Sequence, residues 1–220
     1  MARAAQARPA SDLPDRIVDT ALQMADEVGW EHVRIRDIAD RLEISLADVL
    51  AHFRDKEAIA DAWLRRGVVA MLEEPPEGFA ELPPAERIEI VMMRFFDALA
   101  GHRRTTAQMI RGKMWPTHPH HWVPLIFNLS RTIQWLREAA LLEARGPRRG
   151  FEEIALTGLF LGALSRWVRD DSPGQERTRL YIRRRLERGE RFMSRRRRDP
   201  YPHWEPPPVR PEAPEGTTPY

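Results

Sequence analysis

Four cationic side chains flank a short segment in the first third of the chain, and their chemistry suits contacts with phosphate groups. Arg34 and Arg36 precede this segment, and Arg54 and Lys56 follow it. Contacts of this kind orient a protein on nucleic acid without reading its sequence. The wider region is not basic, because residues 31–72 contain seven Arg and Lys but eight Asp and Glu. That balance is poor for a surface that neutralises phosphates.

The segment between these cations offers few groups that could recognise a base. We expect its DNA-contacting side chains to be Ser45, Leu46, Asp48, Leu50 and His52. None is an Arg, Lys, Asn or Gln, the types that bind guanine or adenine through paired hydrogen bonds. Ser45 and His52 can donate a hydrogen bond, and Asp48 can accept one from cytosine, although nearby phosphates would repel its charge.

Two short helices joined by a tight turn are predicted to position these residues. The spacing of apolar residues indicates a first helix over residues 36–42. Ser45 is a favourable N-cap, and Asp48 can complete a capping box, so a second helix should run to about His52. Two helices joined by so few residues form a helix-turn-helix. Asp55 is expected to cap the helix that follows.

The whole chain is predicted to be all-α, with about nine helices in two domains. We expect a flexible arm at residues 1–11 and a helix-turn-helix domain with its linking helix at residues 12–72. A helical domain for ligand binding and dimerisation should span residues 85–193. Prolines and a glycine in residues 73–84 interrupt the helical spacing and mark the boundary. The Pro- and Arg-rich residues 194–220 are expected to be disordered.

Methionines and aromatic residues of the second domain could enclose a small apolar effector. The members of this set are Met92, Phe96, Met109, Met114, Trp115, Trp122, Phe127 and Trp135. Ordinary core packing accounts for the same pattern equally well. The last three residues belong to a long helix that is predicted to start at Trp122 and to end at Gly146 and Pro147.

A dimer interface is predicted for the last two helices. Residues 151–169 are apolar on nearly every side, which is more than the single buried face of a monomer requires. The interface is expected to contain Leu156, Phe160, Leu164, Trp167, Leu180 and Leu186. Residues 177–198 hold eleven arginines and two glutamates, and we interpret this charge as a solvated helix face rather than a membrane contact.

The remaining composition argues against catalysis and metal binding. The chain has no cysteine, which excludes disulfides, thiol catalysis and cysteine-bound zinc. It has no glycine-rich phosphate loop and no nucleophile elbow, so neither an enzyme nor a cofactor is expected. His118, His120 and His121 could ligate a metal, but adjacent histidines rarely converge on one ion. Without an apolar leader or membrane-length run, the expected location is the cytoplasm.

The stretch Arg34–Ala39, then Ile44-Ser45, then His52–Glu57 resembles the DNA-binding signature of the TetR family in order and spacing. The resemblance covers residues 12–65. It implies a homodimeric regulator, expected to be a repressor, whose second short helix enters the major groove of double-stranded operator DNA. It also implies that Lys56 meets a phosphate, which the free N–H groups of a helix N-terminus would support.

Three positions depart from this family pattern. The family usually has a threonine, a small turn residue and a phosphate-binding tyrosine where this chain has Arg34, Glu43 and Leu50. These departures put base recognition by the second short helix in question. They leave the flanking cations as the main candidates for DNA contact.

A second resemblance gives an alternative function. Residues of the last helix and the turn before it are similar to a pattern in the isoprenoid-binding accessory proteins of ubiquinone biosynthesis, which have a TetR-like fold: Asp171, Ser172, Pro173, Glu176, Thr178 and Arg185. This resemblance implies a lipid chamber lined by residues 88–99 and 125–136 and a basic last helix near an anionic membrane. A third alternative is a helical scaffold that binds proteins through its Pro-rich tail.

Overall fold

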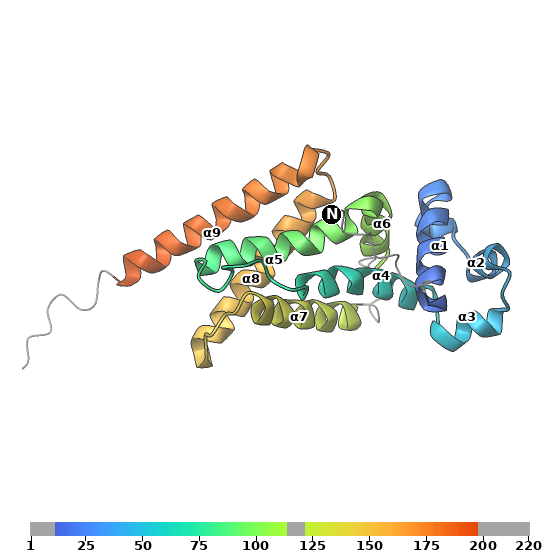
Figure 1. Cartoon of the computed structure of the whole chain (residues 1–220), viewed down its shortest axis with the longest axis horizontal. Helices are drawn as coiled ribbons and strands as arrows, with labels where there is room; N and C mark the ends of the chain where they lie inside the picture. Colours follow the sequence, from blue (N-terminus) through green and yellow to red (C-terminus); the bar gives the residue numbers. More distant parts are fainter. Residues whose placement is uncertain (1–11, 114–121, 198–220) are drawn as a thin grey trace, which may run out of the picture.

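The computed structural model of the chain describes residues 12–113 and 122–197. These residues form nine α-helices and no strand, which confirms the all-α fold. The α-helices are α1 (Leu13–Val28), α2 (Ile35–Leu42), α3 (Leu46–His52), α4 (Lys56–Met71), α5 (Pro84–Leu99), α6 (Arg103–Lys113), α7 (Trp122–Ala139), α8 (Gly146–Trp167) and α9 (Glu176–Arg197). Short 3-10 helices lie at Trp30–His32, Ala100–His102 and Pro173–Gln175. Figure 1 shows an elongated molecule with α1, α2 and α3 at one end and α9 extending toward the other.

Local capping chemistry sets the starts of α1, α3 and α4. The Asp12 carboxylate accepts a hydrogen bond from Leu13 N at the start of α1, and Gly29 ends that helix with a φ of 88°. Ser45 caps α3 as predicted. The Asp55 carboxylate accepts from Ala58 N at 2.7 Å and begins α4. These ends were readable from the sequence because each depends on residues only a few positions apart.

Two predicted boundaries in the second half are wrong. The long helix α7 ends at Ala139, and Gly146 and Pro147 begin α8 instead of ending α7. Proline suits the first turn of a helix, because its φ is already helical and its missing N–H is not needed there. The last helix extends to Arg197, so residues 194–197 are helical rather than part of a disordered tail. The expected arm at residues 1–11 lies outside the described residues.

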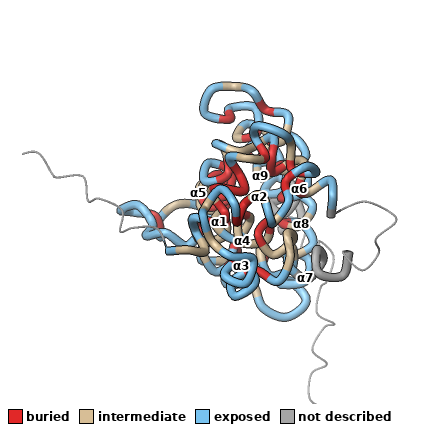
Figure 2. Tube along the Cα trace, turned by 90° about the vertical axis from the view of Figure 1, so that its right-hand side faces the viewer, coloured by how far each residue is buried: buried red, intermediate tan, exposed pale blue. Residues whose placement is uncertain are grey.

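The core of the molecule is built around α5. Its inward side chains are fully buried, and the Phe96 ring lies 5.8 Å from the Phe160 ring and 5.5 Å from the Trp167 ring, centre to centre. The helix α4 packs against α5, where a Cβ built on Gly67 would lie only 2.7 Å from the Phe95 ring. Figure 2 shows this buried material running through the middle of the molecule. The division between two domains at residues 73–84 stays a prediction, because α4 and α5 pack together across it.

A set of polar contacts connects the N-terminal helices α1–α4, here called the head, to α6 in the rest of the chain. We call this set the head–body joint. The Asp26 carboxylate of α1 accepts a hydrogen bond from Thr105 Oγ1 at 2.7 Å and lies 2.6 Å from His102 Nδ1. Trp63 Nε1 of α4 donates to Thr106 Oγ1 at 2.8 Å in a buried setting. Two further partners, Trp30 and Gln108, are joined by a 2.7 Å hydrogen bond from the Trp30 N–H to the Gln108 side chain. No sequence pattern indicates this joint, because its partners are far apart along the chain.

Candidate nucleic-acid interface

The helix α3 lies at the far end of the molecule with most of its surface open to solvent (Figure 2). Val49 is its one buried residue and holds it against α2 and the head core. The turn between α2 and α3 passes through Glu43, whose φ of 55° is left-handed. Non-glycine residues rarely adopt that conformation, and this explains why a small residue is usual at such a turn. The helix is therefore presented outward by a turn under mild strain.

Ser45 and Asp48 form a reciprocal capping box. Asp48 N donates to Ser45 Oγ at 3.1 Å, while Asp48 Oδ2 accepts from Ser45 N at 2.9 Å and from Ser45 Oγ at 2.7 Å. These hydrogen bonds from Ser45 lower the pKa of Asp48, which therefore stays ionised. The expectation that both side chains serve base recognition meets a physical obstacle, because each is engaged with the other.

Three arginines lie at exposed positions in the segments that precede and follow α3 along the chain. The side chains of Arg34 and Arg54 are about four-fifths exposed, and Arg36 is also exposed. Arg34 lies 4.0 Å from Asp37, and Arg54 lies 3.2 Å from Asp55. Exposed ion pairs contribute little to stability, so these guanidinium groups can exchange an intramolecular carboxylate for a phosphate at small cost. They remain candidates for backbone contacts.

Lys56, which the family resemblance predicts to meet a phosphate, directs its ammonium at backbone carbonyl oxygens in the structure. Its ammonium donates to the carbonyl oxygens of Trp30 at 3.0 Å and Val33 at 3.1 Å, and it lies 3.4 Å from that of Glu31. It also lies 5.0 Å from the centre of the Trp30 ring. Partial burial lowers the pKa of Lys56, with the neighbouring Glu57 and Glu31 charges opposing that shift. An ammonium has three donors, and here they join α4 to the 3-10 helix at Trp30–His32.

The predicted apolar pocket is not assembled by its described members. Met92, Phe96 and Met109 are fully buried in the packed core, while Trp135 is half exposed on α7. Two side chains of the set, Trp122 and Phe127, lie on α7 at positions whose side chains are not described, and Met114 and Trp115 lie outside the described residues. Core packing, the alternative left open by the sequence, accounts for the three buried residues.

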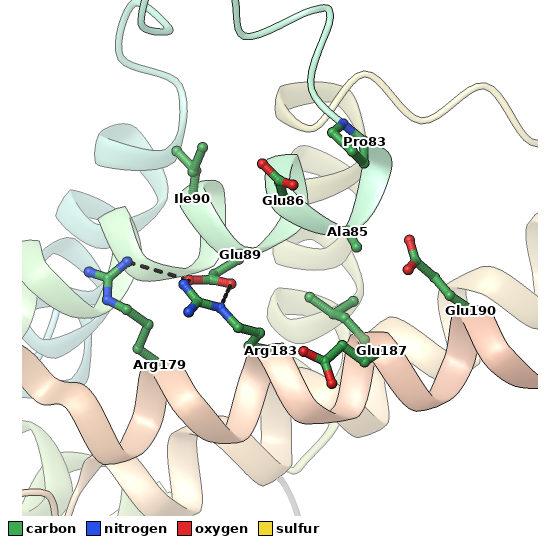
Figure 3. A pocket seen from close by; sticks show the side chains of 10 residues that line it. Pro83, Ala85, Glu86, Glu89, Ile90, Arg179, Arg183, Glu187 and Glu190 are labelled. Carbon is green, nitrogen blue, oxygen red and sulfur yellow. Dashed lines mark hydrogen bonds and ion pairs between the residues drawn. The ribbon is translucent and has the colours of Figure 1, made fainter.

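The described residues instead enclose a groove of about 550 Å³ between α5 and α9 (Figure 3). Its size falls in the range of small-molecule sites, but its lining is charged. Glu89 is buried beneath it and accepts two hydrogen bonds from Arg183, at 2.8 and 3.0 Å, while Arg179 lies 3.7 Å away. Ion pairs along this groove join α9 to α5. Its charged lining does not resemble that of an apolar effector pocket.

The predicted dimer interface needs correction at three positions. Leu156, Phe160 and Trp167 are buried within the single chain, and the Phe160 and Trp167 rings pack against phenylalanines of α5. Trp167 Nε1 also donates to the Gln175 side chain. Leu164 and Leu186 are partly buried, and Leu180 is exposed. The set mixes the inward face of α8 with surface residues.

A different face of α8 is uncharged and exposed, and the sequence prediction missed it. Here called the α8 stripe, it consists of Phe151, Ile154, Ala155, Gly158, Leu161 and Ser165. Phe151 is 75% exposed and Ile154 is 73% exposed. The signal was available, because these positions recur at helical spacing without a charge.

Within residues 12–113 and 122–197, no cluster of three or more His, Asp or Glu could hold a metal ion. His118, His120 and His121 lie outside these ranges. No helix in the same ranges combines the length and apolar character needed to cross a membrane.

Comparison with known proteins places this geometry among bacterial regulators. Residues 17–63 match the family model described as bacterial regulatory proteins, tetR family. The chain is 39% identical to a TetR transcriptional regulator from Nitrosomonas europaea, with 81% of this chain and 98% of that chain covered and a TM-score of 0.72. Among curated proteins none matches the chain.

Two further solved structures share the fold at lower identity. A TetR transcriptional regulator from a Rhodococcus species is 18% identical, covers 82% of this chain and 98% of its own, and gives a TM-score of 0.57. The TetR family regulator PfmR from Thermus thermophilus is 24% identical, covers 79% of this chain and 98% of its own, and gives a TM-score of 0.51.

Proposed function

Because the chain belongs to the TetR family of bacterial regulatory proteins, we propose that it represses transcription as a homodimer that binds an operator through α3. One observation carries the proposal: α3 presents an open face at the end of the molecule, between exposed arginines. A helix of this kind fits the major groove, and flanking cations contact the phosphates beside it.

The test is binding of the purified full chain to duplexes that flank its own gene, at a stated salt concentration. Sequence-specific retardation supports the proposal. Equal, weak binding to every duplex contradicts it, because a general affinity for phosphates carries no regulatory information.

The arginines around α3 provide a sharper version of this test. Neutralising Arg36→Gln or Arg54→Gln should weaken binding to all sequences alike and reduce the salt slope by about one for each phosphate that is no longer neutralised. The matched control is Arg131→Gln, which removes an exposed arginine from α7. If charge removal beside α3 leaves both the affinity and the salt slope unchanged, the arginines are not at the interface.

Dimerisation is part of the proposal, and its surface is the α8 stripe with Leu180 of α9. An uncharged strip on an exposed helix suits a self-complementary contact about a two-fold axis. Such a dimer would set the two α3 helices about one DNA turn apart. The fully buried Phe160 and Trp167 are left out of this surface.

Release by a small apolar effector completes the proposed function. An effector can act only if it binds the DNA-competent and incompetent arrangements of the heads unequally. The head–body joint is the route by which such a difference would reach α1, since Asp26 and Trp30 are bonded directly to α6. A reporter gene behind the operator, tested with apolar compounds, measures this part of the proposal.

No contact in the described residues favours the lipid-carrier alternative. The inward side chains of residues 88–99 are packed against the core rather than around a chamber. Two of the residues that carry the resemblance have a structural explanation, because Ser172 and Thr178 both donate to the Asp170 carboxylate at the start of the last helix. We therefore keep the regulator as the single proposed function.

A further inference from the structure

The outward surface of α3 is largely apolar although it is exposed to solvent. Leu46 is 48% exposed and Leu50 is 65% exposed, although both are large aliphatic side chains. Ala47 and Ala51 lie beside them and are also exposed. These four residues, here called the apolar face of α3, recur one helical turn apart and so form one continuous surface.

The polar groups of α3 are poorly placed to read bases. Asp48 Oδ2 accepts two hydrogen bonds from Ser45, and Ser45 Oγ accepts one from Asp48 N. His52, at the last turn, is the remaining polar side chain of the helix. Recognition by hydrogen bonds is therefore weak, and the larger part of the exposed surface can make only apolar contacts.

Charge around the apolar face indicates the chemistry of its partner. Arg34, Arg36 and Arg54 are all exposed at positions that flank α3. An apolar helix with exposed arginines in the segments before and after it complements a partner that has apolar groups between anions. The major groove of DNA has this arrangement wherever thymine places its C5 methyl group between two rows of phosphates.

We propose that the apolar face of α3 recognises thymine C5 methyl groups, with Leu46 and Leu50 as the specificity-determining residues. This inference rests on the proposed DNA-binding function and adds the chemical feature that is read. Thymine alone among the four bases shows a methyl group in the major groove. The small Ala47 and Ala51 let the helix approach closely enough for aliphatic carbons to meet these methyls at van der Waals distance.

The experiment compares thymine with uracil, because the two bases differ only by the methyl group. A binding site is first selected from a random duplex pool by the full chain, and its half-sites are then synthesised with thymine or with deoxyuridine. Phosphates and hydrogen-bonding groups stay the same. The affinity should fall about fourfold for each contacted methyl, the factor expected when one buried methyl group is removed.

A variant links this loss to the named residues. Leu50→Ala should bind the thymine site more weakly and should show a smaller difference between thymine and uracil than the unmodified chain. The matched control is Val28→Ala, which shortens an exposed apolar residue at the end of α1. Because Leu50 is mostly exposed, its replacement should leave thermal unfolding unchanged, and this measurement confirms that the variant is folded.

The outcomes separate this inference from the proposed function. A selected site that binds equally well with thymine and uracil overturns methyl recognition while leaving sequence-specific binding intact. A pool from which no sequence is enriched overturns the proposed function itself. If Leu50→Ala leaves binding to every duplex unchanged, the apolar face does not enter the groove, and a protein partner becomes its occupant.

Discussion

At the scale of single residues, we expect the intramolecular contacts of Lys56 to stabilise the fold. Its ammonium donates hydrogen bonds to the carbonyl oxygens of Trp30, Glu31 and Val33. Replacing it, Lys56→Ala, should lower the free energy of unfolding by about 1–3 kcal/mol, because these acceptors lose their donor. Chemical denaturation followed by circular dichroism measures the effect.

The control for this prediction is Arg54→Ala, since that side chain is almost fully exposed and its removal should change stability by no more than about 0.5 kcal/mol. The opposite result for Lys56, unchanged stability with weakened DNA binding, would restore its interpretation as a phosphate ligand. For this reason a charge reversal at Lys56 is a poor test of DNA binding, and the exposed arginines are better targets.

Asp170 makes stability depend on pH at the start of the last helix. Burial alone would raise the pKa of this carboxyl, but hydrogen bonds from Ser172 and Thr178 lower it to about 2. A folded-state pKa below the unfolded value gives stability that is present at neutral pH and is lost as the pH falls from about 4 toward 2. The contribution at neutral pH is about 2 kcal/mol.

Asp170→Asn should therefore be less stable than the unmodified chain near neutral pH, and the difference should shrink by about pH 3. Urea titrations at several pH values measure it. Asp171→Asn is the matched control, because the neighbouring carboxyl is exposed and pairs with Arg177 at the surface. A stability difference that is constant across this pH range would contradict the assigned cause.

At the scale of helices, Gly67 sets the distance between α4 and α5. A Cβ at this position would lie 2.7 and 2.8 Å from two carbons of the Phe95 ring and 3.1 Å from Leu99. Gly67→Ala should destabilise the chain by about 1–3 kcal/mol, because the packed helices must separate. This outcome opposes the gain of up to about 1 kcal/mol that alanine normally brings to a helix.

Gly189→Ala provides the comparison, since nothing lies within 4 Å of the added Cβ in α9. That variant should gain stability. Thermal and chemical unfolding should therefore show changes in stability of opposite sign for the two variants. Two changes of the same sign would show that α4 and α5 can move apart at little energetic cost.

Whether the sequence predicts a feature of the helices depends on how far apart along the chain the interacting residues are. Ser45 and Asp48 were assigned to a capping box because the two residues are three positions apart, and the structure has that box. Trp167 was assigned to a dimer surface because sequence alone does not tell which of two apolar faces of a helix meets its own core. The Lys56 contacts were not predictable either, since they depend on where the 3-10 helix near Trp30 lies in space.

At the scale of the whole molecule, the exposed α8 stripe predicts how two copies associate. Ile154→Arg places a charge in the middle of this uncharged surface and should convert the proposed dimer to a folded monomer, because an unpaired charge is costly to bury. Sedimentation velocity measures the change, with circular dichroism as the check on folding.

Val28→Arg controls for the added charge, since Val28 is exposed at the end of α1 and far along the chain from α8. That variant should sediment like the unmodified protein. An Ile154→Arg chain that remains dimeric would remove the stripe from the interface and leave α9 as the surface to examine.

The head–body joint also limits how freely this protein can exchange parts with its relatives. A head grafted from another regulator would need a carboxylate where Asp26 meets Thr105, and an indole N–H where Trp63 meets Thr106. Without the carboxylate the buried Thr105 hydroxyl would lose its acceptor, and without the indole the buried Thr106 oxygen would lose one donor. Engineered sensors built on this scaffold should therefore exchange only the segment that contains α2 and α3, which leaves Asp26, Trp30 and Trp63 in place, rather than everything before the proline-rich segment that precedes α5.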